Sequence, residues 1–116
     1  MNQDPVTVSQ EGDNATDQDP VTVSREGNVL FFKLTGEFDY GLVKLFKHSF
    51  QAEEKAERYV LDLQMVDKIT SAAVGGLMFF HQFVGGDSTD ITLINTRPKV
   101  ERLLKLAQLH KKFKFE

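Results

Sequence analysis

The sequence predicts a single α/β domain, a mixed four- to five-stranded sheet with helices packed mainly on one face. Two observations predict this class. Apolar segments of strand length alternate with segments whose apolar residues recur at helical spacing. Such alternation implies right-handed crossovers between parallel strands, whereas two strands near the start read as an antiparallel hairpin. The 116 residues are enough for one modest core.

The first half of this pattern reads strand, strand, helix. Val21–Ser24 and Val29–Leu34 are expected strands, joined by a turn at 26–28. Gly36–Tyr40 is expected to be a loop, and Gly41–Ala56 a helix. The apolar residues at helical spacing in that helix are Leu42, Leu45, Phe46 and Phe50.

The second half begins with a buried strand at Tyr59–Val66, and the polar residues Asp67 and Lys68 are expected to end it. A helix at Ser71–Val84 follows, and the glycines of Gly85–Asp87 end it. Thr70 or Ser71 can cap this helix, because Ser and Thr accept hydrogen bonds from unpaired N–H groups of the first turn.

The remaining elements are a strand at Ile91–Ile94, a helix that starts near Pro98, and a short terminal strand at Phe113–Phe115. The residues of this last helix that are expected to face inward are Val100, Leu103, Leu104 and Ala107. The predicted order is therefore β-β-α-β-α-β-α with a possible last strand.

A direct repeat precedes the domain. QDPVTVSQEG at Gln3–Gly12 returns as QDPVTVSREG at Gln18–Gly27, and only the second copy leads into a strong strand. Two copies of so short a unit are too few for a repeat architecture. We interpret residues 1–18 as a flexible acidic extension and residues 19–116 as the domain.

Composition limits the function. The net charge of −3 argues against a general nucleic-acid binder. The sequence has no cysteine, no secretory signal and no apolar stretch long enough to span a bilayer, so we expect a cytoplasmic protein without direct membrane insertion. Residues 97–116 hold seven of the fourteen basic residues, a pattern typical of a solvated helix face.

Signals of catalysis are weak. His48, His81 and His110 fall on three separate predicted helices, which disfavours a metal cluster. Neither the G-x-S-x-G nor the phosphate-loop pattern is present. We therefore expect no enzyme activity and no cofactor. Phe79, Phe80 and Phe83 make their helix apolar over more than one face, which favours burial, although an exposed phenylalanine would suit docking.

The strand, hydroxylated turn and helix around Thr70 and Ser71 form the most informative segment. A helix N-terminus is also a favourable place for added negative charge, so this turn fits either an ordinary cap or a phosphorylation switch, with the cap favoured by spacing alone. A second candidate is the acidic segment of Gly36, Glu37 and Asp39, for which a simple turn is the plainer interpretation.

Three sequence segments resemble those of STAS domains, the family of anti-sigma factor antagonists and of the cytoplasmic tails of sulfate transporters. They are LTGEFDY at 34–40, VLDLQMVDKITSAAVGGL at 60–77 and ITLINTRPKVERLLKLAQLHKKFKF at 91–115. In the central segment, the family's aspartate falls on Thr70 and its first serine on Ser71. Its second serine, the usual phosphorylated residue, falls on Ala72.

The resemblance implies a non-enzymatic protein-interaction module in bacterial signalling, similar to an anti-sigma factor antagonist. Its partner would be an anti-sigma factor or a serine kinase-like regulator, and Ser71 or Thr70 would be the phospho-acceptor. The residues of the implied partner-binding surface are Glu37, Asp39, Asp67, Lys68, Thr70, Ser71 and Ala72. Two alternatives remain: a constitutive STAS subunit of a lipid-transport ABC system, and a STAS module that binds a nucleotide or another anion. The oligomeric state is not predicted.

Overall fold

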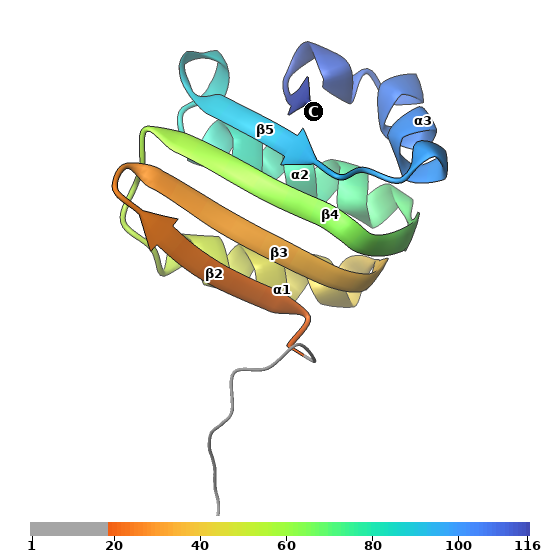
Figure 1. Cartoon of the computed structure of the whole chain (residues 1–116). Coiled ribbons are helices and arrows are strands. Elements are labelled where there is room, and N and C mark those ends of the chain that lie inside the picture. Colours follow the sequence, from red (N-terminus) through yellow and green to blue (C-terminus); the bar gives the residue numbers. More distant parts are fainter. Residues whose placement is uncertain (1–18) are drawn as a thin grey trace, which may run out of the picture.

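The computed structural model describes residues 19–116, which form a five-stranded mixed sheet in the order β2-β3-β4-β5-β6 (Figure 1). β2 (Val21–Glu26) is antiparallel to β3 (Val29–Phe38). β4 (Arg58–Ile69), β5 (Asp90–Ile94) and β6 (Lys114–Phe115) continue the sheet as parallel strands. The predicted mixed sheet with an antiparallel edge is therefore confirmed. The expected extension, residues 1–18, lies outside the described residues.

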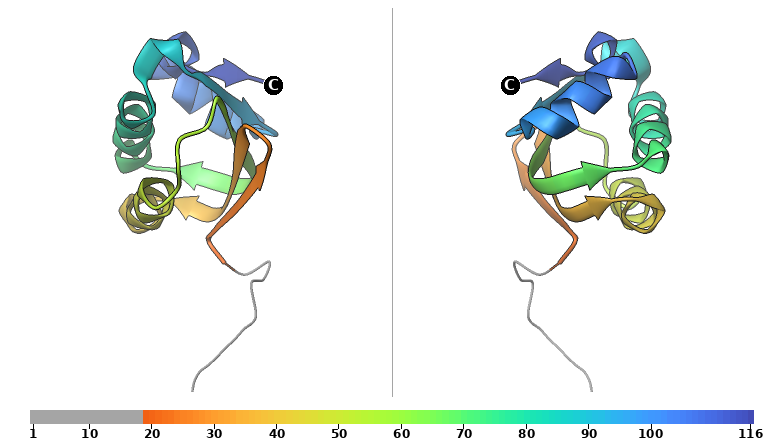
Figure 2. Two further views of the ribbon diagram at one scale, coloured as in Figure 1. Left: turned by 90° about the vertical axis from the view of Figure 1, so that its left-hand side faces the viewer. Right: turned by 90° about the vertical axis from the view of Figure 1, so that its right-hand side faces the viewer.

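Two helices cover one face of this sheet. α1 (Tyr40–Gln51) and α2 (Ser71–Phe83) lie side by side, whereas α3 (Pro98–Leu106) is set apart from them, toward the β5 and β6 side of the sheet (Figures 1 and 2). Short 3-10 turns, η2 (Gly86–Ser88) and η3 (Leu109–Lys111), precede β5 and β6 respectively. Among residues 19–116, no helix combines the length and apolar character needed to cross a membrane.

The core between the sheet and the helices is built on aromatic rings. The Phe80 ring of α2 lies at its centre, 5.9 Å from the ring of Phe32 and 5.4 Å from that of Tyr59, measured between centroids. From α1, the rings of Phe46 and Phe50 lie 5.0 and 4.9 Å from the Phe80 ring. All five side chains are buried, so the burial of α1 and α2 depends on one shared cluster.

β3 and β4 extend furthest beyond their predicted ends, and β2 also runs two residues further than predicted, to Glu26. Gly36–Tyr40 is not a loop, because β3 continues to Phe38 and α1 begins at Tyr40. Asp67 and Lys68 do not interrupt β4, which runs to Ile69. The two strands stay paired through two register shifts, at each of which β4 carries one residue more than β3, and these bulges let exposed polar residues follow the buried run without ending the ladder.

The first helix is shorter than expected, ending at Gln51 rather than Ala56. Residues 52–57 are composed of good helix formers, yet the backbone makes other bonds. The N–H groups of Glu57 and Arg58 donate to the Asn28 carbonyl at 3.0 and 3.2 Å. The Ala56 N–H donates to the Tyr59 hydroxyl at 2.9 Å. These tertiary bonds lead the chain into β4 and override local helix propensity.

α3 buries a narrower stripe than predicted. Val100 and Leu104 are fully buried, but Leu103 is 42% exposed and Ala107 is also exposed. In this nine-residue helix the buried side chains are Val100 and Leu104, which lie at i and i+4 and therefore on the same face. The expected terminal strand is present as β6.

We propose that residues 19–116 fold without the preceding segment, because they contain the whole buried core described above. Deletion of residues 1–17 is expected to leave the free energy of unfolding unchanged within about 0.5 kcal/mol, as for surface changes. Urea denaturation of the full chain and the shortened chain checks this, and a clear loss of stability would show that the extension supports the fold.

Candidate functional site

Two sequence segments that were predicted separately meet at one edge of the sheet. β3 and β4 are parallel neighbours, with Glu37 opposite Lys68 and Phe38 opposite Ile69. A single residue then separates each strand from its helix. Both helices therefore begin at the carboxyl ends of adjacent strands, the edge at which α/β sheets commonly bind ligands. We call this the junction surface; its residues are Glu37, Asp39, Asp67, Lys68, Thr70, Ser71 and Ala72.

The two helix starts are capped differently. The Asp39 carboxylate accepts a hydrogen bond from the Leu42 N–H at 3.0 Å and so caps α1. Thr70 occupies the N-cap position of α2 but makes no side-chain cap; its hydroxyl instead faces the Phe38 carbonyl at 3.4 Å. Ser71 is the first helical residue. The predicted hydroxyl cap of α2 is therefore wrong. A side-chain cap is present at the start of α1 instead, and it comes from Asp39, a residue for which the sequence favoured a simple turn.

This difference predicts unequal stability effects. Asp39→Ala is expected to lower the free energy of unfolding by about 1 kcal/mol, the usual value of an N-cap bond. Thr70→Ala removes no cap and only the long 3.4 Å hydrogen bond to the Phe38 carbonyl, so its effect should be smaller, about 0.5 kcal/mol. Chemical denaturation of both variants tests this, and an equal loss in both would contradict the assignment of the caps.

The junction surface is accessible at its charged and hydroxyl groups. Glu37, Asp67, Lys68 and Ser71 are exposed, whereas Asp39, Thr70 and Ala72 are half-buried. On one side, Thr70 and Ser71 border a shallow apolar hollow. It is completed by Ile69, Val74 and Leu103. The exposure of Leu103, which the sequence did not predict, thus places apolar surface directly beside Ser71.

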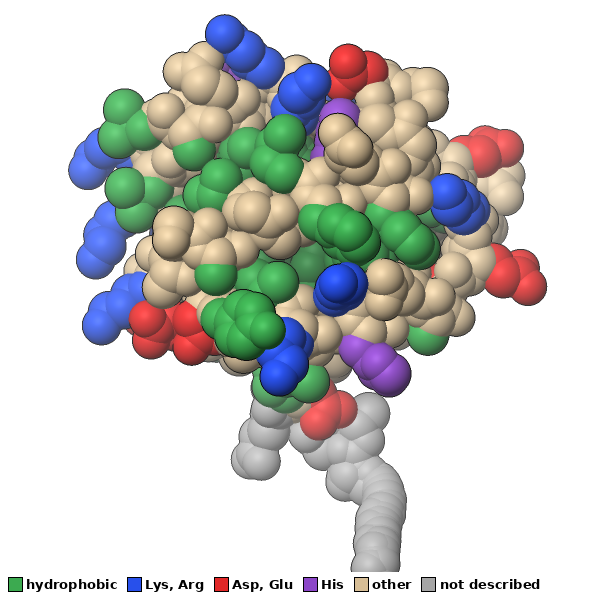
Figure 3. Space-filling view, turned by 180° about the vertical axis from the view of Figure 1, so that it is seen from behind, with side chains coloured by type: hydrophobic (Ala, Val, Ile, Leu, Met, Phe, Trp, Pro, Cys, Tyr) green, Lys and Arg blue, Asp and Glu red, His purple; other side chains and the backbone are tan. Residues whose placement is uncertain are grey.

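On the other side, Ala72 lies in a groove between α1 and α2. The groove has a volume of about 310 Å³ and is lined by Tyr40, Val43, Lys47, Phe50, Ala72, Gly75, Gly76 and Phe79. Figure 3 shows hydrophobic side chains gathered on this face, with lysines among them. Phe80 is buried as expected, but Phe79 is 43% exposed. The sequence raised an exposed phenylalanine only as the less favoured reading, and it gave no indication of the groove.

The histidines do not form a site. His81 is buried and its Nε2 lies 3.2 Å from the Asp87 carboxylate, whereas His48 and His110 are exposed. Within residues 19–116, no three side chains of the types that ligate metals are grouped.

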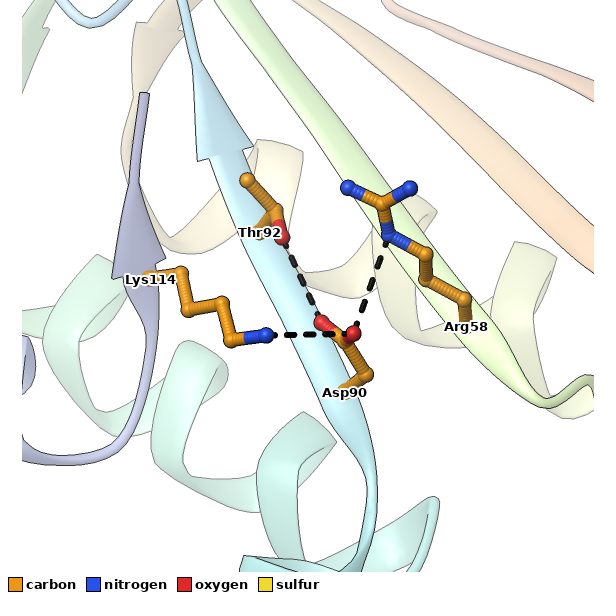
Figure 4. A network of polar contacts seen from close by, with 4 residues as sticks. All are labelled: Arg58, Asp90, Thr92 and Lys114. Carbon is orange, nitrogen blue, oxygen red and sulfur yellow. Dashed lines mark hydrogen bonds and ion pairs between the residues drawn. The ribbon is translucent and has the colours of Figure 1, made fainter.

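A polar network at the opposite ends of the strands has a structural explanation. The Asp90 carboxylate of β5 lies 3.2 Å from Lys114 on β6 and 3.9 Å from Arg58 on β4, and the Thr92 hydroxyl faces it at 3.4 Å (Figure 4). These contacts link three neighbouring strands. Because the charges pair with one another, this network offers little for a ligand.

Comparison with known proteins agrees with the fold. The sequence model of the STAS domain matches residues 20–116. A STAS-domain containing protein of Pseudomonas aeruginosa is 29% identical over 86 residues, which cover 73% of this chain and 85% of that protein.

Two solved structures share the architecture. The anti-sigma factor antagonist SpoIIAA in its unphosphorylated form aligns with a TM-score of 0.63 and 13% identity, covering 83% of this chain and 86% of that one. A proposed anti-sigma factor antagonist from Thermotoga maritima aligns with a TM-score of 0.73 and 21% identity, covering 82% of this chain and 84% of that one. At these identities the likeness concerns the fold. With the family match over nearly the whole described chain, it confirms the resemblance inferred from the three sequence segments: the chain belongs to the STAS domain family.

Proposed function

We propose that this STAS domain is a non-enzymatic interaction module that acts in the cytoplasm and binds a regulatory protein through the junction surface, as an anti-sigma factor antagonist does. The observation that carries this proposal is the position of Ser71. It is exposed at the start of α2, between the apolar hollow at Leu103 and the groove that contains Ala72. A polar residue between two apolar depressions is an arrangement suited to protein docking.

Regulation by phosphate would act through Ser71. A phosphoserine carries about −1.5 to −2 charges at neutral pH. At the first position of α2, the helix dipole and the free N–H groups would accommodate this charge, so the fold would persist while the docking surface changed. Thr70 is the weaker acceptor candidate, because it is half-buried and its hydroxyl faces the Phe38 carbonyl.

Ala72 favours a second candidate, a constitutive STAS subunit of a larger assembly such as a lipid-transport ABC system. At the position that corresponds to the family's usual acceptor, this chain has a methyl group that forms part of an apolar groove. Such a wall suits permanent contact with a partner, and phosphorylation at Ala72 is chemically impossible.

Affinity capture with the full chain, followed by mass spectrometry, tests the two candidates. We expect the antagonist to capture an anti-sigma factor or a serine kinase, and the capture to fail with Ser71→Asp. Recovery of a transport ATPase that also binds Ser71→Asp would support the constitutive subunit. A partner whose binding is unaffected by charge reversal at both Glu37 and Lys68 would contradict docking at the junction surface.

A further inference from the structure

The groove between α1 and α2 has apolar walls and a positive rim. The Lys47 ammonium lies 4.7 Å from the centroid of the Phe79 ring, and that of Lys44 lies 5.5 Å from the centroid of the Tyr40 ring. Neither lysine forms an ion pair with any carboxylate in residues 19–116. The lysines therefore cover exposed aromatic rings and retain unneutralised charge beside apolar surface.

Two adjacent glycines of α2 differ in what they contact. A Cβ atom at Gly76 would lie 2.8 Å from a Val43 methyl group, so Gly76 is needed for the close approach of α1. A Cβ atom at Gly75 would meet nothing within 4 Å. Glycine in the middle of a helix destabilises it relative to alanine. The packing of the described residues explains Gly76 but leaves Gly75, which lines the groove, without a structural reason.

The shape and chemistry of the groove favour a helix as its occupant. Its walls run along α1 from Tyr40 to Phe50, a rise of about 15 Å, which is nearly three helical turns. Apart from the Lys47 ammonium and the Tyr40 hydroxyl, the lining side chains carry no hydrogen-bonding group, so they offer few partners for the open backbone of an extended peptide. A helix satisfies its own backbone groups and can insert apolar side chains at i, i+3, i+4 and i+7.

We propose that this groove binds a three-turn amphipathic helix of a partner protein, with apolar anchors in the groove and carboxylates opposite Lys44 and Lys47. Gly75 leaves the space into which the partner helix packs. This inference rests on the proposed function only in that the partner is a protein. It adds the kind of segment that the partner would present to the groove, a helix, and the negative charge of that helix. Charge complementarity selects the acidic class of helix, because neither lysine of this rim forms an ion pair within residues 19–116.

The test uses the full chain and two displayed libraries of helical peptides. Both libraries carry apolar residues at i, i+3, i+4 and i+7; one has Asp or Glu and the other Lys at the flanking positions. We expect enrichment from the acidic library alone, with tenfold weaker binding after Gly75→Ala or Lys47→Glu. Gln82→Ala, on an exposed part of α2 outside the groove, and Lys99→Glu on α3 are the controls and should bind as the parent does.

Stability separates an occupied groove from a damaged fold. Gly75→Ala should raise the thermal midpoint by about 3–6 °C, since alanine favours the helix and meets no neighbour. Failure to enrich acidic peptides, enrichment of the basic library, or unchanged binding by Gly75→Ala would each overturn the inference, as would a lowered midpoint for that variant. Ala72 belongs to both surfaces, so the two proposals are separated by their readouts: Ser71→Asp is measured with the captured partner and Gly75→Ala with the peptides. Failure of the peptide tests therefore leaves the proposed function to be decided by the capture experiment.

Discussion

Replacement of Ser71 by Asp is expected to weaken partner binding at least tenfold, whereas Ser71→Ala should retain it. A tenfold change corresponds to about 1.4 kcal/mol, well within what a charge introduced at a docking surface can change. Ser71 is exposed at the first position of α2, so the substitution places a charge on the surface without disturbing the core. Negative charge at a helix start stabilises the helix by about 0.3–1 kcal/mol, so unfolding cannot account for the lost binding.

Isothermal titration with the captured partner measures this effect, and the denaturation of each variant is followed in parallel. Ser24→Asp on β2 is a matched control, because it adds the same charge at an exposed serine near the hairpin, at the opposite end of β3 from the junction surface. Its affinity should equal that of the parent chain. Equal affinities for Ser71→Asp and Ser71→Ala would rule out a charge-controlled surface at this residue.

The sequence predicted which elements form more reliably than where they end. Strand and helix periodicities are local, so the order of elements and the mixed sheet followed directly from the residues. The ends of β3 and β4 did not, because Glu37 and Lys68 are polar residues held in strands by pairing with each other. That pairing joins residues far apart in the sequence, and its irregular register leaves no local pattern. The same pairing brings the two predicted halves of the junction surface together.

The groove was beyond sequence analysis for a similar reason. α2 is apolar on most of its circumference, so periodicity could not show that Phe80 points to the core while Phe79 points to solvent. The position of α1, set by its aromatic contacts with Phe80 and by the close approach of Val43 to Gly76, defines which side of α2 stays open. The Asp39 cap was missed because aspartate is favoured both in turns and at helix starts, so its presence alone does not distinguish them.

Phe80→Ala is expected to produce the largest loss of stability, about 3–5 kcal/mol, the range for removing a buried aromatic ring. Phe80 is fully buried, and its ring contacts aromatic rings from β3, β4 and α1, so truncation leaves a cavity between both helices and the sheet. Domains of this size have a total stability of about 5–15 kcal/mol, so the variant should unfold at a much lower urea concentration.

Phe79→Ala is the matched control for this prediction, since it removes the same ring from the neighbouring position. Phe79 is 43% exposed, so its loss should lower the free energy of unfolding by only about 1 kcal/mol. Phe79→Ala should nevertheless weaken binding to the acidic helical peptides, although the variant remains folded. Phe79 forms a wall of the groove, and the Lys47 ammonium lies over its ring. Similar losses of stability in both variants would contradict the division of α2 into a core-facing side and a partner-facing side.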